Sequence, residues 1–193
     1  CGPIHPATVS GFKYFLMIID QFSGFKHVAL LKTKDEASAK LTSFINEIEN
    51  QTNKSVKIIN SDGGGEFLDS SIKSFCARKG IIHRVSPPYS PQMNGFAERA
   101  NRSTLDKLRC LMIQSRLPSN MWGEAISYAT FLNNITPSKS NDFFLPPKQI
   151  FTGIAPVLNH LKPFGCKAYV LLPKIHRQSK LHSVVAEGIN LGY

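Results

Sequence analysis

Hydrophobic and polar positions along the first part of the chain predict a hairpin followed by a helix. Residues 12–20 and 25–32 are rich in β-forming side chains, and Ser23-Gly24 lies between them, which predicts a β-hairpin. Residues 34–50 then change to a helical period. Their apolar side chains recur at three- and four-residue steps, at Ala37, Leu41, Phe44, Ile45 and Ile48.

The next segments alternate between strand and helix. Short apolar runs at 56–60 and 81–85 predict two buried strands, and the first ends in Ser-Asp-Gly-Gly-Gly. A helix is predicted over 68–79, with Gly80 as its C-terminal stop. A strand pair followed by strand–helix alternation indicates an α/β sandwich with a mixed sheet.

Two further helices are predicted in the middle of the chain. Residues 86–95 (SPPYSPQMNG) contain three prolines and a glycine, so no regular structure is expected there. A long helix is predicted from Phe96 to about Gln114, with one apolar stripe along it. Another helix is predicted from Pro118 to about Asn133.

After residue 136 the pattern changes. Residues 137–163 are rich in proline and predict an extended connector with one short helix at 147–152. Strands are predicted at 166–172 and 187–193, on either side of a basic stretch. We therefore expect two units: an α/β core over 1–136, and over 137–193 a Pro-rich connector with a small C-terminal β extension.

Composition narrows the classes of partner. The chain has 23 Lys and Arg against 13 Asp and Glu, for a formal net charge of +10. Such an excess favours an anionic partner, although composition does not separate DNA from RNA or an anionic membrane. No apolar run approaches the roughly 20 residues that cross a bilayer, so no membrane span is expected. The scattered cysteines and histidines do not have zinc-finger spacing.

Two acidic residues stand out as candidates for chemistry. Asp62 follows a predicted buried strand and precedes three glycines, so its carboxylate would lie at the open edge of a sheet where a backbone can approach closely. Glu98 lies in the predicted first turn of the long helix. Each also has a purely structural explanation, because Asp-Gly is a turn signal and an acid near a helix N-terminus favours the dipole.

The two acids together match a family pattern. INSDGGGEF at 59–67 and YSPQMNGFAERANR at 89–102 place 35 residues between Asp62 and Glu98. This arrangement resembles the D,D(35)E signature of the integrases of retroviruses and LTR retrotransposons. Further segments are similar to copia-type elements in particular: Trp122-Gly-Glu-Ala125, Leu145-Pro-Pro147 and Phe164-Gly-Cys166.

The resemblance implies an integrase catalytic core with an RNase H-like fold, a five-stranded mixed sheet flanked by helices. It implies metal-dependent polynucleotidyl transfer, in which the 3′ ends of the element DNA are processed and then joined to target DNA. Asp62 and Glu98 would be catalytic and would hold Mg²⁺, with Mn²⁺ as a substitute, because carboxylate oxygens suit these hard ions.

The family uses a third acid, on the first strand shortly before a Gly-Pro like Gly2-Pro3. We expect that acid to lie upstream of Cys1, and the chain as it stands to be inactive. Asp20 is not expected to replace it. In the family fold the second strand runs antiparallel to the first, so Asp20 would lie at the opposite edge of the sheet from Asp62, in a turn or in a contact with a helix.

The resemblance also implies DNA contacts. Ser90, Gln92 and Asn94 lie in the segment that matches the family's mobile loop, whose small polar side chains touch DNA. Arg102 is one helical turn after Glu98 and matches a DNA-contacting basic position, with Arg99 as a weaker candidate. A solvated basic helix face explains the two arginines equally well.

The implied partners are element-end DNA, target DNA, further copies of the chain and the adjoining domains of a Pol polyprotein. The implied location is the nucleus, after assembly in cytoplasmic particles. The alternative interpretation is a decayed or domesticated integrase-like domain that binds DNA without catalysis.

Overall fold

The computed structural model describes residues 1–86, 91–139, 141–173, 175 and 183–193, and for residues 91–94 the backbone alone. The chain begins with an antiparallel hairpin of β1 (Tyr14–Ile19) and β2 (Lys26–Leu31), in the register Tyr14↔Leu31. Helix α1 (Glu36–Thr52) follows. The hairpin and the helix predicted from the hydrophobic pattern are both present.

The second strand pair is parallel. Strand β3 (Ile58–Ser61) pairs with β4 (Ile82–Val85), and the connection between them holds the short 3₁₀ helix η1 (Gly65–Phe67) and α2 (Ser70–Lys79). Gly80 ends α2 with a φ of 66°, a left-handed conformation that glycine adopts without steric cost, as the sequence predicts. This is a strand–helix–strand unit, the arrangement expected from the alternation of patterns.

The long helix begins earlier than predicted. Helix α3 runs over Pro91–Ser115, so residues 91–95 are helical and their expected lack of regular structure is wrong. Proline favours the first position of a helix, because its fixed φ is helical and its missing N–H has no partner there in any case. After the short 3₁₀ helix η2 (Ser119–Met121), α4 spans Trp122–Ile135.

The expected five-stranded sheet is absent from the described part of the chain, which instead contains three separate two-stranded sheets. On its other edge, β1 pairs only with the N-terminal segment: the Cys1 and Phe15 backbones exchange hydrogen bonds of 2.8 and 3.0 Å, and Ile4 N–H donates to Lys13 C=O. Pro3 has no N–H to continue this pairing.

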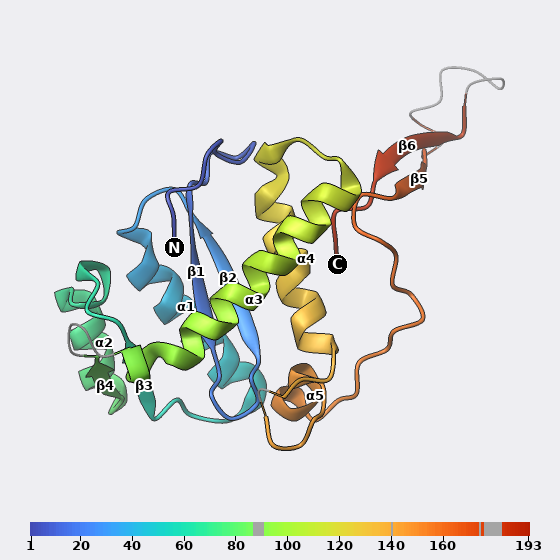
Figure 1. The fold of residues 1–193 in the computed structure, drawn as a ribbon. Helices are drawn as coiled ribbons and strands as arrows, with labels where there is room; N and C mark the ends of the chain where they lie inside the picture. Colours follow the sequence, from blue (N-terminus) through green and yellow to red (C-terminus); the bar gives the residue numbers. More distant parts are fainter. Residues whose placement is uncertain (87–90, 140, 174, 176–182) are drawn as a thin grey trace.

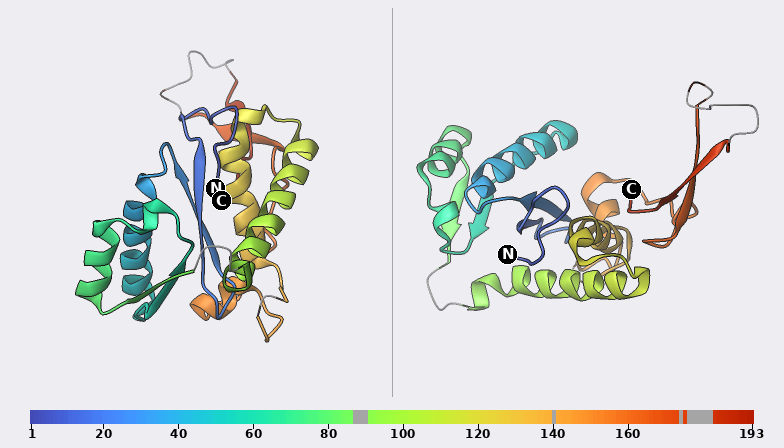
Figure 2. Two further views of the ribbon diagram at one scale, coloured as in Figure 1. Left: turned by 60° about the vertical axis from the view of Figure 1, so that its left-hand side comes forward. Right: turned by 90° about the horizontal axis from the view of Figure 1, so that it is seen from above.

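Strand β1 separates two helical layers (Figures 1 and 2). Its alternating side chains enter different cores: Leu16 and Ile18 pack with α1 and α2, whereas Phe15 and Met17 pack toward α3 and α4. Around Phe15, the buried residues Trp122 and Ile126 of α4 complete the second core. The result is an α/β arrangement with helices on both faces of the hairpin.

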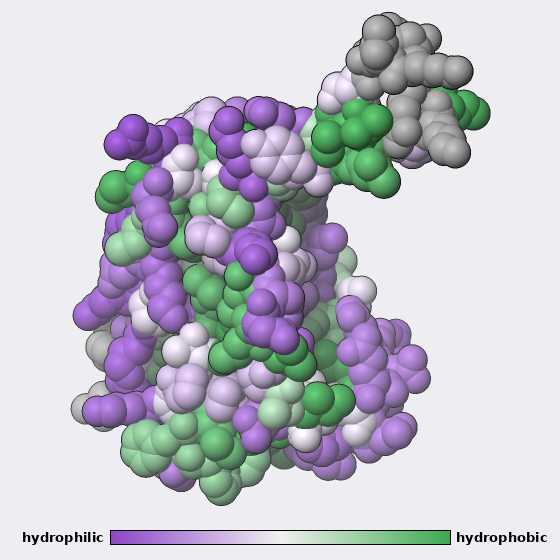
Figure 3. Space-filling model, turned by 90° about the vertical axis from the view of Figure 1, so that its right-hand side faces the viewer, coloured by the Kyte–Doolittle hydropathy of each residue, from purple (hydrophilic) through white to green (hydrophobic). Residues whose placement is uncertain are grey.

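The C-terminal region extends away from this body. Helix α5 (Pro147–Thr152) lies where the sequence predicts it, and β5 (Lys167–Leu171) pairs with β6 (Val185–Ile189) in an antiparallel hairpin. Strand β6 begins two residues earlier and ends four residues earlier than predicted. The hairpin projects from the body (Figures 1 and 3). Several of its apolar side chains are exposed: Tyr169, Val170, Leu171, Val185 and Ile189. Among the described residues, no helix is both long and apolar enough to cross a membrane.

A buried side-chain amide completes the pairing of β2. The Lys26 N–H donates to Asn134 Oδ1 at 2.8 Å, and Asn134 Nδ2 donates to the Lys26 C=O at 2.7 Å. Asn134 therefore acts on the free edge of β2 as a neighbouring strand would. This contact joins α4 to a strand 108 residues earlier in the chain.

Replacing Asn134 with alanine leaves both Lys26 backbone groups buried without partners. We expect Asn134→Ala to lower the free energy of unfolding by about 2–4 kcal/mol, since each unsatisfied buried group costs roughly 1–3 kcal/mol. Urea unfolding followed by circular dichroism measures the change. Asn46→Ala, at an exposed position on α1, is the control. An equal loss in the two variants would contradict the role of the amide.

A side-chain hydrogen bond also joins β3 to β4. Ser61 Oγ lies 2.9 Å from His83 Nε2. Burial lowers the pKa of His83 from its ordinary value, and the nearby charge of Lys73 lowers it further. The folded chain therefore binds a proton at His83 less readily than the unfolded chain does.

This difference predicts a pH-dependent stability. As pH falls below the unfolded histidine pKa of about 6.5, the unfolded chain gains a proton that the fold resists, so stability decreases until the folded pKa is reached. His83→Gln should reduce the loss of stability between pH 7.5 and 5.5, measured as the shift of the urea midpoint. His5→Gln, at an exposed position, is the control. An unchanged pH dependence in His83→Gln would refute this assignment.

Candidate active site

Asp62 lies at the C-terminal end of β3, where the sequence predicts it. The parallel pairing with β4 continues to this point, because Ser86 N–H donates to Ser61 C=O at 2.9 Å. Ser61 is buried, whereas Asp62 is exposed. Within the described part of the chain, the Asp62 carboxylate accepts a long hydrogen bond of 3.4 Å from the Gly64 N–H at Oδ1. A carboxylate held at a strand end and open to solvent is available to an incoming ligand.

The glycines after Asp62 leave room for a second carboxylate. A Cβ atom placed on Gly64 would lie 3.2 Å from Asp62 Oδ1 and 2.9 Å from Glu66 Oε2. The two oxygens are thus separated by no more than the sum of these distances. Sequence reasoning did not single out Glu66. The available signal was an acid directly after a run of glycines that follows another acid.

The N-terminal segment lies near the same two carboxylates. Burial lowers the pKa of the Cys1 terminal ammonium, while the negative charges of Glu66 and Asp62 act in the opposite direction and that of Lys34 adds to the lowering. The first residue of the chain therefore lies within electrostatic range of the carboxylates that follow β3.

Glu98 stands on α3, at an exposed position. Because α3 begins at Pro91, Glu98 lies well inside the helix, and its expected place in the first turn is wrong. The helix dipole then gives no explanation for the acid, since the effect fades within one turn. Helix α3 packs against β1 and α4.

The structure does not gather a full set of acids. Within the described ranges, no group of three or more Asp, Glu, His or Cys side chains is placed to hold a metal ion. Asp20 is engaged elsewhere: its Oδ2 accepts hydrogen bonds from Ser23 N–H at 2.8 Å and Ser23 Oγ at 2.5 Å. Asp20 thus stabilises the hairpin turn, in agreement with the role predicted for it.

The structure describes only some of the residues predicted to contact DNA. Arg99 and Arg102 are exposed on α3, near Glu98. Gln92 and Asn94 belong to the first turn of α3, but their side chains lie outside the described atoms, and Ser90 lies outside the described residues altogether. The structure therefore leaves these contacts as predictions.

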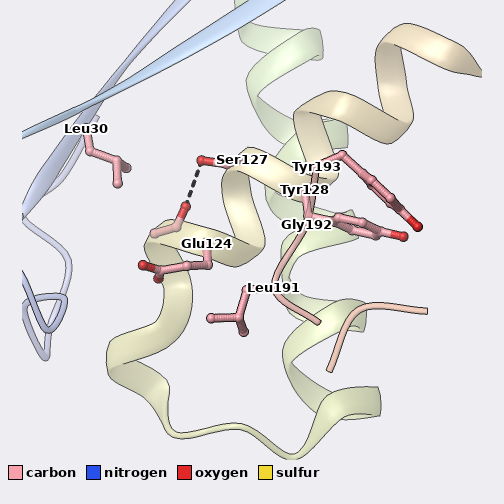
Figure 4. Close-up of a pocket in the computed structure, with 8 residues that line it drawn as sticks. Leu30, Glu124, Ser127, Tyr128, Leu191, Gly192 and Tyr193 are labelled. Carbon is pink, nitrogen blue, oxygen red and sulfur yellow. Dashed lines mark hydrogen bonds between the residues drawn. The ribbon is translucent and has the colours of Figure 1, made fainter. Parts of the chain in front are cut away.

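A separate recess lies between α4 and the C-terminal residues (Figure 4). Its volume is about 340 Å³, and the residues around it include Leu30, Glu124, Ser127, Tyr128, Leu191 and Tyr193. Oε2 of Glu124 is buried without a hydrogen-bond partner in the described part of the chain. A single carboxylate among apolar and aromatic side chains does not match the several oxygen ligands that Mg²⁺ takes. The β3 end is the better candidate for metal chemistry.

Comparison with known sequences identifies relatives for the whole chain. Residues 3–91 match the model of the integrase core domain family. The chain is 36% identical over 193 residues to the retrovirus-related Pol polyprotein from transposon TNT 1-94 of Nicotiana tabacum, covering all of this chain and 14% of that protein. It is 29% identical over 182 residues to the Pol polyprotein from transposon RE1 of Arabidopsis thaliana, covering 94% of this chain and 12% of that protein. The chain thus spans a small part of each relative's length.

Solved integrase structures share the fold. The catalytic core domain of BIV integrase aligns with a TM-score of 0.53 at 22% identity, covering 71% of this chain and 84% of that one. A chain of the simian T-cell lymphotropic virus intasome, in complex with PP2A regulatory subunit B56 gamma, aligns with a TM-score of 0.57 at 19% identity, covering 90% and 61%.

The catalytic core domain of HTLV-2 integrase, in a trimeric complex with magnesium, aligns with a TM-score of 0.51 at 25% identity, covering 69% of this chain and 80% of that one. The RNase H-like α/β class is confirmed by these alignments, whereas the five-stranded sheet is not. Residues 3–91 match the integrase core family, and the two Pol polyproteins match all or nearly all of this chain. The chain therefore belongs to the integrase core family and is related to the Pol polyproteins of plant retrotransposons.

Proposed function

We propose that this chain is the core of an enzyme that inserts retrotransposon DNA into target DNA by metal-dependent polynucleotidyl transfer. The reaction comprises cleavage near the 3′ ends of the element DNA and transfer of those ends to the target. The observation that carries the proposal is the position of Asp62, which is exposed at the C-terminal end of β3 beside side-chain-free glycines. Family membership and the spacing to Glu98 support it.

The residues at this position fit a divalent cation. Magnesium prefers oxygen ligands and keeps several of its waters, so a few carboxylates on an open surface suit it. Asp62 and Glu98 are the proposed ligands, and Mn²⁺ is the proposed substitute. When bound, such ions stabilise the charge that develops on the entering and leaving oxygens of phosphoryl transfer. The HTLV-2 neighbour was determined in complex with magnesium, which supports the choice of metal.

A third carboxylate is proposed to lie upstream of Cys1. Asp20 is unsuited to the task because its carboxylate is engaged by Ser23 in the hairpin turn. Cys1 lies within electrostatic range of Asp62, so residues that precede it would continue from the neighbourhood of the site.

The proposed DNA partners are the element ends and the target duplex. A net charge of +10 favours association with phosphates, and the exposed Arg102 and Arg99 are the proposed contacts on α3, together with Ser90, Gln92 and Asn94. Joining two DNA ends calls for at least two protomers, so a homo-oligomer within a larger Pol-derived assembly is proposed. The nucleus is the proposed site of integration, after assembly in cytoplasmic particles.

A second candidate function is DNA binding without catalysis. The observation that favours it is the lack of a three-acid cluster in the part of the chain that the structure describes. A domesticated or decayed integrase relative would keep the fold and the basic surface while losing the reaction. The two functions differ in their dependence on Asp62 and Glu98.

Strand transfer in a protein extended upstream of Cys1 separates the two functions. We expect activity with Mg²⁺ or Mn²⁺, and a loss of more than about 100-fold in Asp62→Asn or Glu98→Gln, because even outer partners of metal ligands contribute 10–100-fold. Gel analysis of joined DNA products measures the rate. Glu47→Gln, an exposed α1 position, is the control and should retain parental activity. DNA binding without joined products from the folded parent would instead support the non-catalytic function.

Arg102 offers a test of the DNA contact. Arg102→Ala should weaken binding to element-end DNA, and the slope of log affinity against log salt should decrease by about 1, because one phosphate contact is lost. Fluorescence anisotropy at several salt concentrations measures both quantities. Arg78→Ala removes an exposed arginine from α2 and is the matched control. If both variants behave alike, Arg102 is part of a solvated basic face and the contact is wrong.

A further inference from the structure

We propose that Glu66 shares the divalent cation with Asp62, as an additional carboxylate ligand of the metal site. The inference rests on the proposed function, which supplies the metal. It adds a residue that the two-acid pattern of Asp62 and Glu98 does not include. The short backbone segment between Asp62 and Glu66 and the absence of a side chain at Gly64 bring the two carboxylates near each other.

The turn after β3 brings the two acids together. Three glycines separate Asp62 from Glu66 in sequence, and η1 begins at Gly65, so one short turn joins the two acids. Both carboxylates approach the same point in front of Gly64, at 3.2 Å for Asp62 Oδ1 and 2.9 Å for Glu66 Oε2. Their oxygens are therefore no more than about 6 Å apart. Small rotations of two short side chains bring such a pair onto one ion, whose Mg–O distances are about 2.0–2.1 Å.

The negative charges of Asp62 and Glu66 favour the binding of a cation at this turn. Two carboxylates this close repel each other when both are ionised. The salt bridges found in the described ranges do not include Asp62 or Glu66, and the charge of the Cys1 ammonium reaches both acids without forming an ion pair with either. A divalent ion between them would offset the repulsion, and the missing side chain at Gly64 leaves the space open.

The additional oxygen also suits the coordination demand of the metal. Magnesium takes six oxygens in a near-octahedral arrangement, and solvent fills those positions that the protein does not. Glu66 contributes from the same turn as Asp62, so its position does not depend on the packing of α3. Asp62 and Glu66 together form a local ligand pair that can bind metal before DNA is engaged.

Mn²⁺ binding to the 193-residue chain tests the inference without any catalytic readout. Free Mn²⁺ is followed by electron paramagnetic resonance during titration, and the melting temperature of every variant confirms folding. Glu66→Gln keeps the size of the side chain and removes its charge, and we expect the affinity to fall at least about 5-fold, with Asp62→Asn weaker still. Asp35→Asn is the matched control, because Asp35 and Glu66 line the same surface recess.

A glycine pair provides a second test that leaves every ligand in place. A Cβ on Gly64 meets both carboxylates, whereas a Cβ on Gly65 meets nothing within 4 Å. Gly64→Ala should therefore weaken Mn²⁺ binding by forcing the two carboxylates apart, and Gly65→Ala should not. Equal effects of the two alanines would contradict the shared site.

The outcomes separate this inference from the proposed function. Loss of affinity in Asp62→Asn with parental affinity in Glu66→Gln would overturn the role of Glu66 and leave the metal site at Asp62 intact. An equal loss in Asp35→Asn and Glu66→Gln would reduce the effect to general charge and also overturn it. No saturable binding by the parent chain would overturn both the Glu66 inference and the metal assignment of the proposed function.

Discussion

The alternation of side chains along β1 is the constraint on which the rest of this structure depends. Successive residues of a strand point to opposite faces, and in β1 both faces are covered by helices. Leu16 and Ile18 need the α1–α2 layer, while Phe15 and Met17 need the α3–α4 layer. A shift of one residue in the β1–β2 register would exchange the two sets and disrupt both cores at once. The register of the hairpin therefore determines where each layer can pack.

The candidate site follows from this arrangement. Asp62 belongs to the β3–β4 unit, which packs with α1 and α2, whereas Glu98 stands on α3 in the other layer. Within the β3 unit, the parallel pairing ends at Ser61, and the glycines that follow let the chain turn sharply enough to bring Glu66 beside Asp62. The acid pair at 62 and 66 is thus a local product of one turn. Any cooperation with Glu98 requires the two layers to hold their relative positions.

Buried polar side chains connect segments that are remote in sequence. Asn134 binds the backbone of Lys26, Asn141 donates to the Ser23 carbonyl, and Trp122 Nε1 donates to the Pro6 carbonyl. The contacts of Asn134 and Asn141 satisfy backbone groups of the buried residues Lys26 and Ser23. The contact of Asn141 also ties the segment after α4 to the turn of the β1–β2 hairpin. The proline-rich region is therefore attached to the core near its start, although the β5–β6 hairpin projects freely.

The sequence by itself determined the local elements and the chemistry of the first candidate residue. The spacing of apolar residues and the positions of glycine and proline predicted the β1–β2 hairpin, α1, α2 and α5, because these signals are local properties of the chain. A run of glycines after an apolar strand identified Asp62 as a candidate. The sequence pattern placed the start of α3 too late. Prolines usually interrupt a helix, but Pro91 instead occupies the first position of α3. Only the tertiary structure decided that the strands form three small sheets and that Asn134 of α4 completes the free edge of β2. These outcomes depend on which backbone edges and side chains meet in space, and spacing along the chain does not specify that.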